Sequence, residues 1–449
     1  MAQATPENPE TAPTAGDVAA AQASASQATQ TVTAHVAQKT TVHLPEKAPA
    51  EVQAATATTP QPIFDTDPRR RNSLLAAVIV AGVVLGIALL LVLAYFLIFI
   101  GPGLSFVGAL LALIPLAIVL IGVRWIDRWE PEPRLLLIIA FLWGATVSIV
   151  IALVADVGTS YLYAAAGADQ NWTVFLQSVV QAPIVEEGGK GLGILLIYLV
   201  ARRYFDGPVD GIVFAALVAG GFAFTENIQY FAIQIAESGR LDLAVGEIFF
   251  IRGILSPFAH VMFTAFTGFF IGLAARKGTA FGGILFFFVG LIPAILLHAF
   301  WNGVLFFIYD FYAYYVFVQV PLFAIAVVGV ILLRRREAKM TQLRLGEYAA
   351  AGWFNAAEVN TLGTGPGRRQ AQAWARQRGL GKVMKEYIRD ATHLAFTRNR
   401  IVSGRDRIGS QADEALLLAQ VSESRARLAA AAPAAHRTDA PVAPAPPAG

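Results

Sequence analysis

The sequence predicts an all-α membrane protein: a polytopic bundle of about eight helical spans, with disordered tails and a small helical region near the C-terminus. Three observations support this class. Of the 449 residues, 56% are apolar and only 14% are charged, whereas soluble domains carry about 25% charged residues. Eight apolar segments reach the ~20 residues that cross a bilayer. Basic residues cluster in alternate connections between those segments.

The N-terminal segment, residues 1–68, is rich in Ala, Thr, Gln and Pro and has almost no large apolar residues. Such a composition cannot bury a core, so we expect a disordered tail. Polar sequence follows Met1 directly, and no secretory signal is expected.

A membrane domain is predicted over residues 69–336. Within it, Gly101-Pro102-Gly103 predicts a tight turn between the first two spans. The eight predicted spans cover roughly residues 74–100, 103–123, 135–157, 174–200, 210–236, 249–275, 281–308 and 312–333.

The connections on one side of the predicted bundle are basic, and those on the other side are nearly free of Lys and Arg. Only Arg240 and Arg252 break the pattern. Because cytoplasmic connections carry the excess of positive charge, both termini are predicted to be cytoplasmic. The basic clusters are Arg69–Arg71, Arg124 with Arg128 and Arg134, Arg202 with Arg203, Arg276 with Lys277, and Arg334–Arg336.

The C-terminal part of the chain is predicted to lie in the cytoplasm in two pieces. Residues 337–431 contain Ala-, Arg- and Leu-rich stretches that predict short amphipathic helices. Residues 432–449 are rich in Ala and Pro, which predicts disorder. The net charge of +3 is attributed to membrane orientation, and no nucleic-acid partner is expected.

The fourth predicted span contains three ionisable residues, Glu186, Glu187 and Lys190. Charged groups inside a membrane are costly and usually face a partner or a water-filled cavity. Two adjacent carboxylates point about 100° apart on a helix, so one lysine cannot satisfy both. A purely structural ion pair between helices would leave one carboxylate over, and this favours a functional site.

Three further spans each carry polar residues. Glu226 and Tyr230 share a face of the fifth span, His260 lies on the sixth, and His298 and Asn302 share a face of the seventh. Each could be a structural hydrogen-bonding group when taken alone. An amide beside an imidazole also suits a ligand-orienting pair or an oxyanion site.

The depth of these residues supports a shared site. At about 1.5 Å per residue, Glu187 lies near the middle of its span. Glu226, His260 and His298 each fall within roughly 5 Å outward of the middle of theirs. Scattered structural polar groups would have no reason to share one depth.

Several protease classes are excluded by absent residues. The chain contains no Cys, which rules out thiolate nucleophiles and Cys-ligated zinc. The HExxH, GxSG and GxGD motifs of site-2 zinc, rhomboid-type serine and presenilin-type aspartyl proteases are also absent.

At the remaining motifs the chain resembles the PrsW family of intramembrane proteases, over about residues 74–333. The resemblance rests on Pro183–Lys190, Gly221–Tyr230, His260 and His298–Asn302, together with the loop Asp127–Pro133. PrsW proteins are similar to the wider superfamily of CAAX- and bacteriocin-processing membrane proteases. That superfamily has a histidine where this chain has Glu226, and His260 could supply the missing imidazole.

The resemblance implies hydrolysis of membrane-anchored proteins in a plasma membrane of bacterial type. PrsW-like proteases cleave membrane-anchored anti-sigma factors on the extracytoplasmic side. The expected partners are therefore a membrane-anchored protein substrate and the lipid bilayer.

A paired-glutamate mechanism is expected. Glu187, or its neighbour Glu186, would act as general base on a water molecule. Lys190 would hold the other carboxylate.

The remaining polar residues allow two mechanisms. His260, His298 and Glu226 either bind a Zn²⁺ ion that polarises the water and the scissile carbonyl, or form a metal-free acid–base and oxyanion site. Asn302 would orient His298 or donate to the oxyanion.

Two other functional classes remain open at this stage. A proton- or ion-coupled transporter also uses membrane-embedded Glu and His, but the chain shows no repeated half-structure with paired broken helices. A membrane scaffold that binds partners through its tails would leave the aligned polar groups unexplained.

Overall fold

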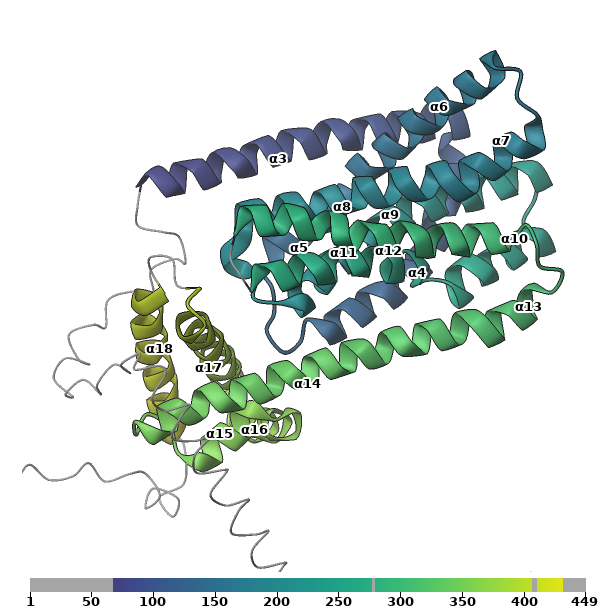
Figure 1. The fold of residues 1–449 in the computed structure, drawn as a ribbon. Coiled ribbons are helices and arrows are strands. Elements are labelled where there is room, and N and C mark those ends of the chain that lie inside the picture. The colour runs from purple at the N-terminus through teal and green to yellow at the C-terminus, as the bar shows by residue number, and fades with distance from the viewer. Residues whose placement is uncertain (1–67, 277–278, 406–409, 431–449) are drawn as a thin grey trace, which may run out of the picture.

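The computed structural model describes residues 68–276, 279–405 and 410–430. Every regular element in these ranges is a helix, which confirms the all-α class (Figure 1). Apart from Pro68, the two tails predicted to be disordered lie outside the described residues.

Within the described residues, seven helical segments are long and apolar enough to cross a membrane. Several are built from an α-helix continued by one π-helical turn (η). The seven are α3 (Pro68–Tyr95) with η1 (Phe96–Ile100), α4 (Pro102–Ile126), α5–η2–α6 (Arg134–Leu142, Trp143–Ser148, Ile149–Ala165), α9 (Pro208–Ser238), α10–η5–α11 (Leu243–Phe249, Phe250–Leu255, Ala259–Ala275), α12 (Ala280–Val304) and α13–η6–α14 (Phe311–Tyr314, Tyr315–Gln319, Val320–Ala350).

The eighth predicted span is also helical, but it is not among the seven. It consists of α7 (Gln170–Leu176), η3 (Gln177–Gln181) and α8 (Ala182–Ala201). In Figure 1 it runs alongside α9, α11 and α12 for the length of the bundle. Its three ionisable residues, the same ones that suggested a functional site, set it apart from the apolar spans.

Helix α9 forms the centre of the bundle, with 94% of its most apolar window buried. Small residues allow its neighbours to approach closely. A Cβ on Gly211 would lie 1.9 Å from the carbonyl oxygen of Gly268 on α11, and a Cβ on Gly221 would lie 2.1 Å from that of Phe141 on α5. These contacts hold α9 and α11, which carry Glu226 and His260, at backbone-contact distance.

Four helices follow the last span and form a core of their own. They are α15 (Ala356–Gly363), α16 (Gly365–Gln377), α17 (Gly381–Val402) and α18 (Ser410–Ala430). Their buried apolar side chains include Leu362, Leu394 and Val421, which pack together with Leu345 and Tyr348 of α14.

Arginines join these helices to the membrane bundle. Arg400 Nη1 of α17 lies 2.8 Å from Asp206 Oδ2 in the connection before α9. Arg368 Nη1 of α16 donates to the carbonyl oxygen of Trp129, at 3.0 Å. Burial raises the pKa of the Asp206 carboxyl, and the guanidiniums of Arg400 and Arg405 oppose that shift. The C-terminal helices are thus held to one end of the bundle by charged contacts.

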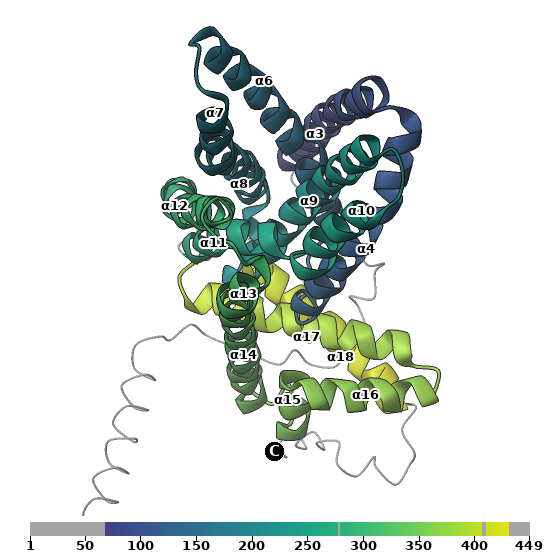
Figure 2. The ribbon, with the colours of Figure 1, turned by 90° about the vertical axis from the view of Figure 1, so that its right-hand side faces the viewer.

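Helix α14 stands away from the other spans. Only 6% of its most apolar window is buried, and in the end-on view of Figure 2 it lies apart from the central helices. Most of this span is therefore exposed on the outside of the bundle.

The orientation of the bundle is open to a direct labelling test. The chain has no Cys, so single cysteines can be introduced without background. A cysteine at exposed Ala165, at the end of α6, should react with an impermeant maleimide in whole cells. A cysteine at exposed Ala373, on α16, should react only after the cells are opened. The reverse labelling pattern would contradict cytoplasmic termini.

Candidate active site

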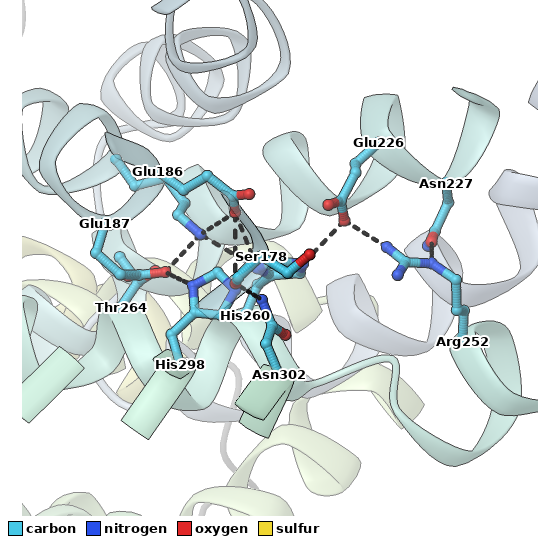
Figure 3. A network of polar contacts seen from close by, with 11 residues as sticks. Ser178, Glu186, Glu187, Glu226, Asn227, Arg252, His260, Thr264, His298 and Asn302 are labelled. Atoms are coloured by element: carbon cyan, nitrogen blue, oxygen red, sulfur yellow. Dashed lines mark hydrogen bonds and ion pairs between the residues drawn. The ribbon is translucent and has the colours of Figure 1, made fainter. Parts of the chain in front are cut away.

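Four helices bring their polar side chains to one place inside the bundle (Figure 3). Helix α8 contributes Glu186, Glu187 and Lys190, and the facing helices contribute Glu226 from α9, His260 from α11 and His298 from α12. Contacts of 4.0 Å or less join all six of these side chains into one network.

The Glu187 side chain is fully buried. Its Oε1 lies 2.6 Å from Lys190 Nζ and 3.1 Å from His298 Nδ1. Its Oε2 accepts a hydrogen bond from Thr264 Oγ1 at 2.7 Å. The Glu187 carboxylate thus has three partners inside the protein and does not face the cavity.

Glu186 points the other way, into a cavity. The cavity has a volume of about 730 Å³, and Glu186, His260 and His298 line it, whereas Glu187 does not. Glu186 Oε2 lies 3.9 Å from His260 Nδ1 and 4.0 Å from His298 Nε2. The two adjacent carboxylates therefore have different environments, as their 100° separation on the helix requires.

Each imidazole is oriented by a second carboxylate. His298 Nδ1 faces Glu187, and His260 Nε2 lies 2.9 Å from Glu226 Oε2. Ionised carboxylates only accept hydrogen bonds, so these two nitrogens carry the protons. The other nitrogens, His260 Nδ1 and His298 Nε2, are then left as acceptors that face Glu186.

Arg252 of η5 completes this chain of contacts and was not anticipated from the sequence. Its guanidinium pairs with Glu226, and its Nε donates to Asn227 Oδ1 at 3.0 Å. The group also stacks on the ring of Tyr230, at 3.7 Å. The sequence did mark Arg252 as one of two exceptions to the alternation of basic connections. An arginine close to a membrane span needs an acidic partner, and this could have pointed to Glu226.

Asn302 is placed differently from the expectation. Its Nδ2 donates to the carbonyl oxygen of Ser178 in η3, at 2.9 Å, which ties α12 to the helix before α8. Its side chain lines the same cavity as His298.

Among the described residues, Glu186, His260 and His298 form a group that could hold a metal ion, because one ligand atom from each lies within 4.8 Å of the others. Two neutral imidazole nitrogens and a carboxylate, each imidazole backed by a second carboxylate, match the donor set of catalytic zinc. The donor set therefore fits Zn²⁺. The trio differs from the expected ligand set in one member, since Glu226 is engaged by Arg252 and His260.

Lys190 is the one feature that opposes a bound cation. Its ammonium lies 3.1 Å from His260 Nδ1 and 3.5 Å from Glu186 Oε2. An ion bound by these atoms would displace both contacts. The pair with Glu187, at 2.6 Å, would remain and keep the lysine charge balanced.

Known proteins resemble this chain over the region that carries the site. The family described as PrsW family intramembrane metalloprotease matches residues 132–341. Protease PrsW of Clostridioides difficile (strain 630) is 34% identical over 199 residues, which are 44% of this chain and 78% of that protein. Protease PrsW of Geobacillus kaustophilus (strain HTA426) is 28% identical over 33% of this chain and 58% of its own length.

No solved structure matches the chain significantly. The matched region runs from Glu132 to Thr341, so it includes all the helices that carry site residues and leaves out α15 to α18. The chain belongs to the PrsW family of intramembrane proteases.

Proposed function

We propose that this protein is an intramembrane endopeptidase whose reacting water is held between Glu186, His260 and His298. The observation that carries the proposal is the convergence of these three side chains on one wall of a cavity inside a membrane bundle. Family membership supports peptide hydrolysis, and it favours a protease over an ion-coupled transporter built from the same groups.

The chemistry follows from which groups are free. Glu186 has no hydrogen-bond partner shorter than the 3.5 Å contact with Lys190, so its carboxylate takes a proton from the water as the oxygen attacks the scissile carbonyl. The same carboxyl returns the proton to the leaving amide nitrogen. Zn²⁺ bound by Glu186, His260 and His298 would instead engage the Glu186 carboxylate as a ligand and would itself polarise the water and the carbonyl, so the base role of Glu186 belongs to the arrangement without an ion.

The other two carboxylates, Glu187 and Glu226, orient the two imidazoles. Glu187 and Glu226 fix the tautomers of His298 and His260, and Arg252 holds Glu226 in place. Lys190 keeps the buried Glu187 charged. Glu187, Glu226, Lys190 and Arg252 are therefore positioning residues in this proposal, and Glu186 is the general base.

The substrate class is a membrane-anchored protein with a single span, such as an anti-sigma factor. The cavity lies within the membrane bundle, so a scissile bond must reach it from the bilayer. A purified-protein assay on single-span peptides tests this: cleavage within or beside the span supports the proposal, and intact peptides with an otherwise folded enzyme contradict it.

Metal content gives a second test. The arrangement in which Glu186, His260 and His298 bind Zn²⁺ predicts about one Zn²⁺ per chain in purified active protein, and reversible loss of cleavage with a chelator. His260→Ala and His298→Ala should each lose the metal in elemental analysis. Asn302→Ala, which removes a neighbouring polar group outside the trio, should retain it. Full activity with well under stoichiometric metal would leave Glu186 acting on water without an ion.

A further inference from the structure

A second cavity lies at the junction of the membrane bundle and the C-terminal helices. It has a volume of about 370 Å³ and is formed by the end of α4 with the following loop, the end of the apolar part of α14, and the helices α16 and α17. The lining residues are Trp125, Arg128, Trp129, Ile331, Arg334, Arg335, Ala338, Gly365, Arg368, Arg369, Gln372 and Ile388.

The lining of this cavity is strongly cationic. Five of the lining residues are arginines and none is acidic. The ion pairs on this side of the molecule belong to other arginines, such as Arg398 with Glu347 and Arg400 with Asp206. Among the residues that the structure describes, no ion pair involves any of the five cavity arginines. Glu130 and Glu337 act on Arg368 and Arg334 from outside the cavity, but no carboxylate lines it. A cavity lined by five arginines and no acidic residue is an anion site in electrostatic terms.

Two of the arginines are held rigidly. Arg368 is buried, with 8% of its surface exposed, and its nitrogens donate only to neutral acceptors: the carbonyl oxygens of Leu362 and Trp129 and the hydroxyl of Thr392. Its guanidinium stacks on Trp129 at 3.5 Å. Burial lowers the pKa of this guanidinium, because only Glu130 partly offsets the cost.

Arg334 is the second fixed arginine. Its guanidinium lies over the ring of Trp125 at 4.4 Å, and its buried Nε has no hydrogen-bond partner among the described residues. Arg128, Arg335 and Arg369 are exposed at the rim. The cavity thus combines two buried or partly buried guanidiniums, one with an unpartnered Nε, and three exposed arginines at its rim, an arrangement suited to phosphate oxygens.

The position of the cavity favours a lipid headgroup over a free phosphate ion as its ligand. Trp125 and Ile331 lie where two spans end, and Trp125 is 42% exposed, as in the aromatic belt at a membrane interface. The apolar part of α14, which supplies one wall, is almost entirely exposed on the outside of the bundle. An acyl chain can therefore lie along α14 while its headgroup occupies the arginine cavity.

We propose that this cavity binds the headgroup of an anionic phospholipid at the membrane face where the C-terminal helices dock. Trp125 and Ile331 contact the glycerol and upper acyl region, and the arginines bind the phosphate. The lipid then bridges α4, α14 and α16, which are brought together at this cavity.

Native mass spectrometry of the full-length protein in detergent tests the site, with phosphatidylglycerol as the probe and phosphatidylcholine and inorganic phosphate as comparisons. Wild type should retain phosphatidylglycerol in preference to phosphatidylcholine. Arg335→Gln/Arg369→Gln removes two exposed rim charges, and it should weaken retention at least about tenfold. Arg336→Gln/Arg376→Gln removes two exposed arginines that do not line the cavity, and it should retain the lipid as wild type does.

Equal retention by both double variants would overturn the proposal, because the charges would then serve membrane orientation alone. Equal retention of phosphatidylglycerol and phosphatidylcholine would overturn it as well. Displacement of phosphatidylglycerol by low millimolar inorganic phosphate would assign the cavity to a free phosphate ion and not to a lipid. All variants should show the wild-type melting temperature, since the substituted arginines are exposed.

Discussion

A Glu186→Gln variant should lose cleavage of a single-span substrate by at least about a hundredfold while remaining folded in the membrane. Glu186 faces the cavity and lies 3.5 Å or more from its charged neighbours. An amide cannot accept the proton of the attacking water, but it keeps the shape of the side chain. Because a neutral amide is cheaper to bury than a carboxylate, the melting temperature should stay close to that of the wild type.

The matched control for this variant is Glu237→Gln, an exposed carboxylate on α9 outside the cavity. It should cleave at the wild-type rate. Initial rates on a purified single-span peptide, with thermal unfolding in the same detergent, make the comparison. If Glu186→Gln is as active as Glu237→Gln, the general base lies elsewhere.

Glu187→Gln should instead damage the fold. Glu187 and Lys190 are both fully buried and form a 2.6 Å ion pair. Removing the Glu187 charge leaves the 3.5 Å contact with Glu186 as the remaining ion pair of buried Lys190, and breaking a buried pair in this way costs up to about 3–5 kcal/mol. We expect a clearly lower melting temperature, a lower membrane level, and loss of activity because His298 also loses its orienting carboxylate.

A second variant separates these two effects. Glu187→Gln/Lys190→Met removes both charges, and it should regain much of the lost stability without regaining activity. A Glu187→Gln protein that melts like the wild type and cleaves substrate would show that the buried pair is dispensable. This expectation reverses the roles that the sequence favoured, in which Glu187 was preferred as the base.

The sequence could predict where the helices lie in the chain, but not which side of each helix faces the cavity. Runs of apolar residues locate the spans, because length and composition reflect the bilayer thickness. The helical segments run past several predicted ends: the third continues to Ala165 and the last to Ala350. Which of Glu186 and Glu187 faces the cavity depends on the rotation of α8. That rotation is set by distant contacts such as Trp143 Nε1 with the carbonyl oxygen of Gly189, at 2.9 Å.

The residues grouped around the possible metal site show the same limit of sequence-based prediction, because Glu186 takes the place expected for Glu226. Sequence spacing placed Glu226 at the right depth beside His260, yet its carboxylate is turned toward Arg252, 26 residues further along the chain. The π-helical turn η5 that positions Arg252 has no recognised signature in the sequence. Composition therefore finds the chemical groups, and long-range contacts decide which of them are free to react.

The charged α8 helix has a consequence for how the protein is made. Three ionisable groups cost about 2.5–3.5 kcal/mol each at the centre of an isolated helix, or roughly 8–10 kcal/mol together. Glu187 and Lys190 pair within α8, but the partners from other helices come later in the chain, and His298 follows Glu187 by 111 residues. At about 5–20 residues per second, the ribosome needs roughly 5–20 s to supply them. During that interval α8 has to be sheltered by the insertion machinery or rest at the bilayer surface, so assembly of the catalytic centre and insertion of its central helix are one event.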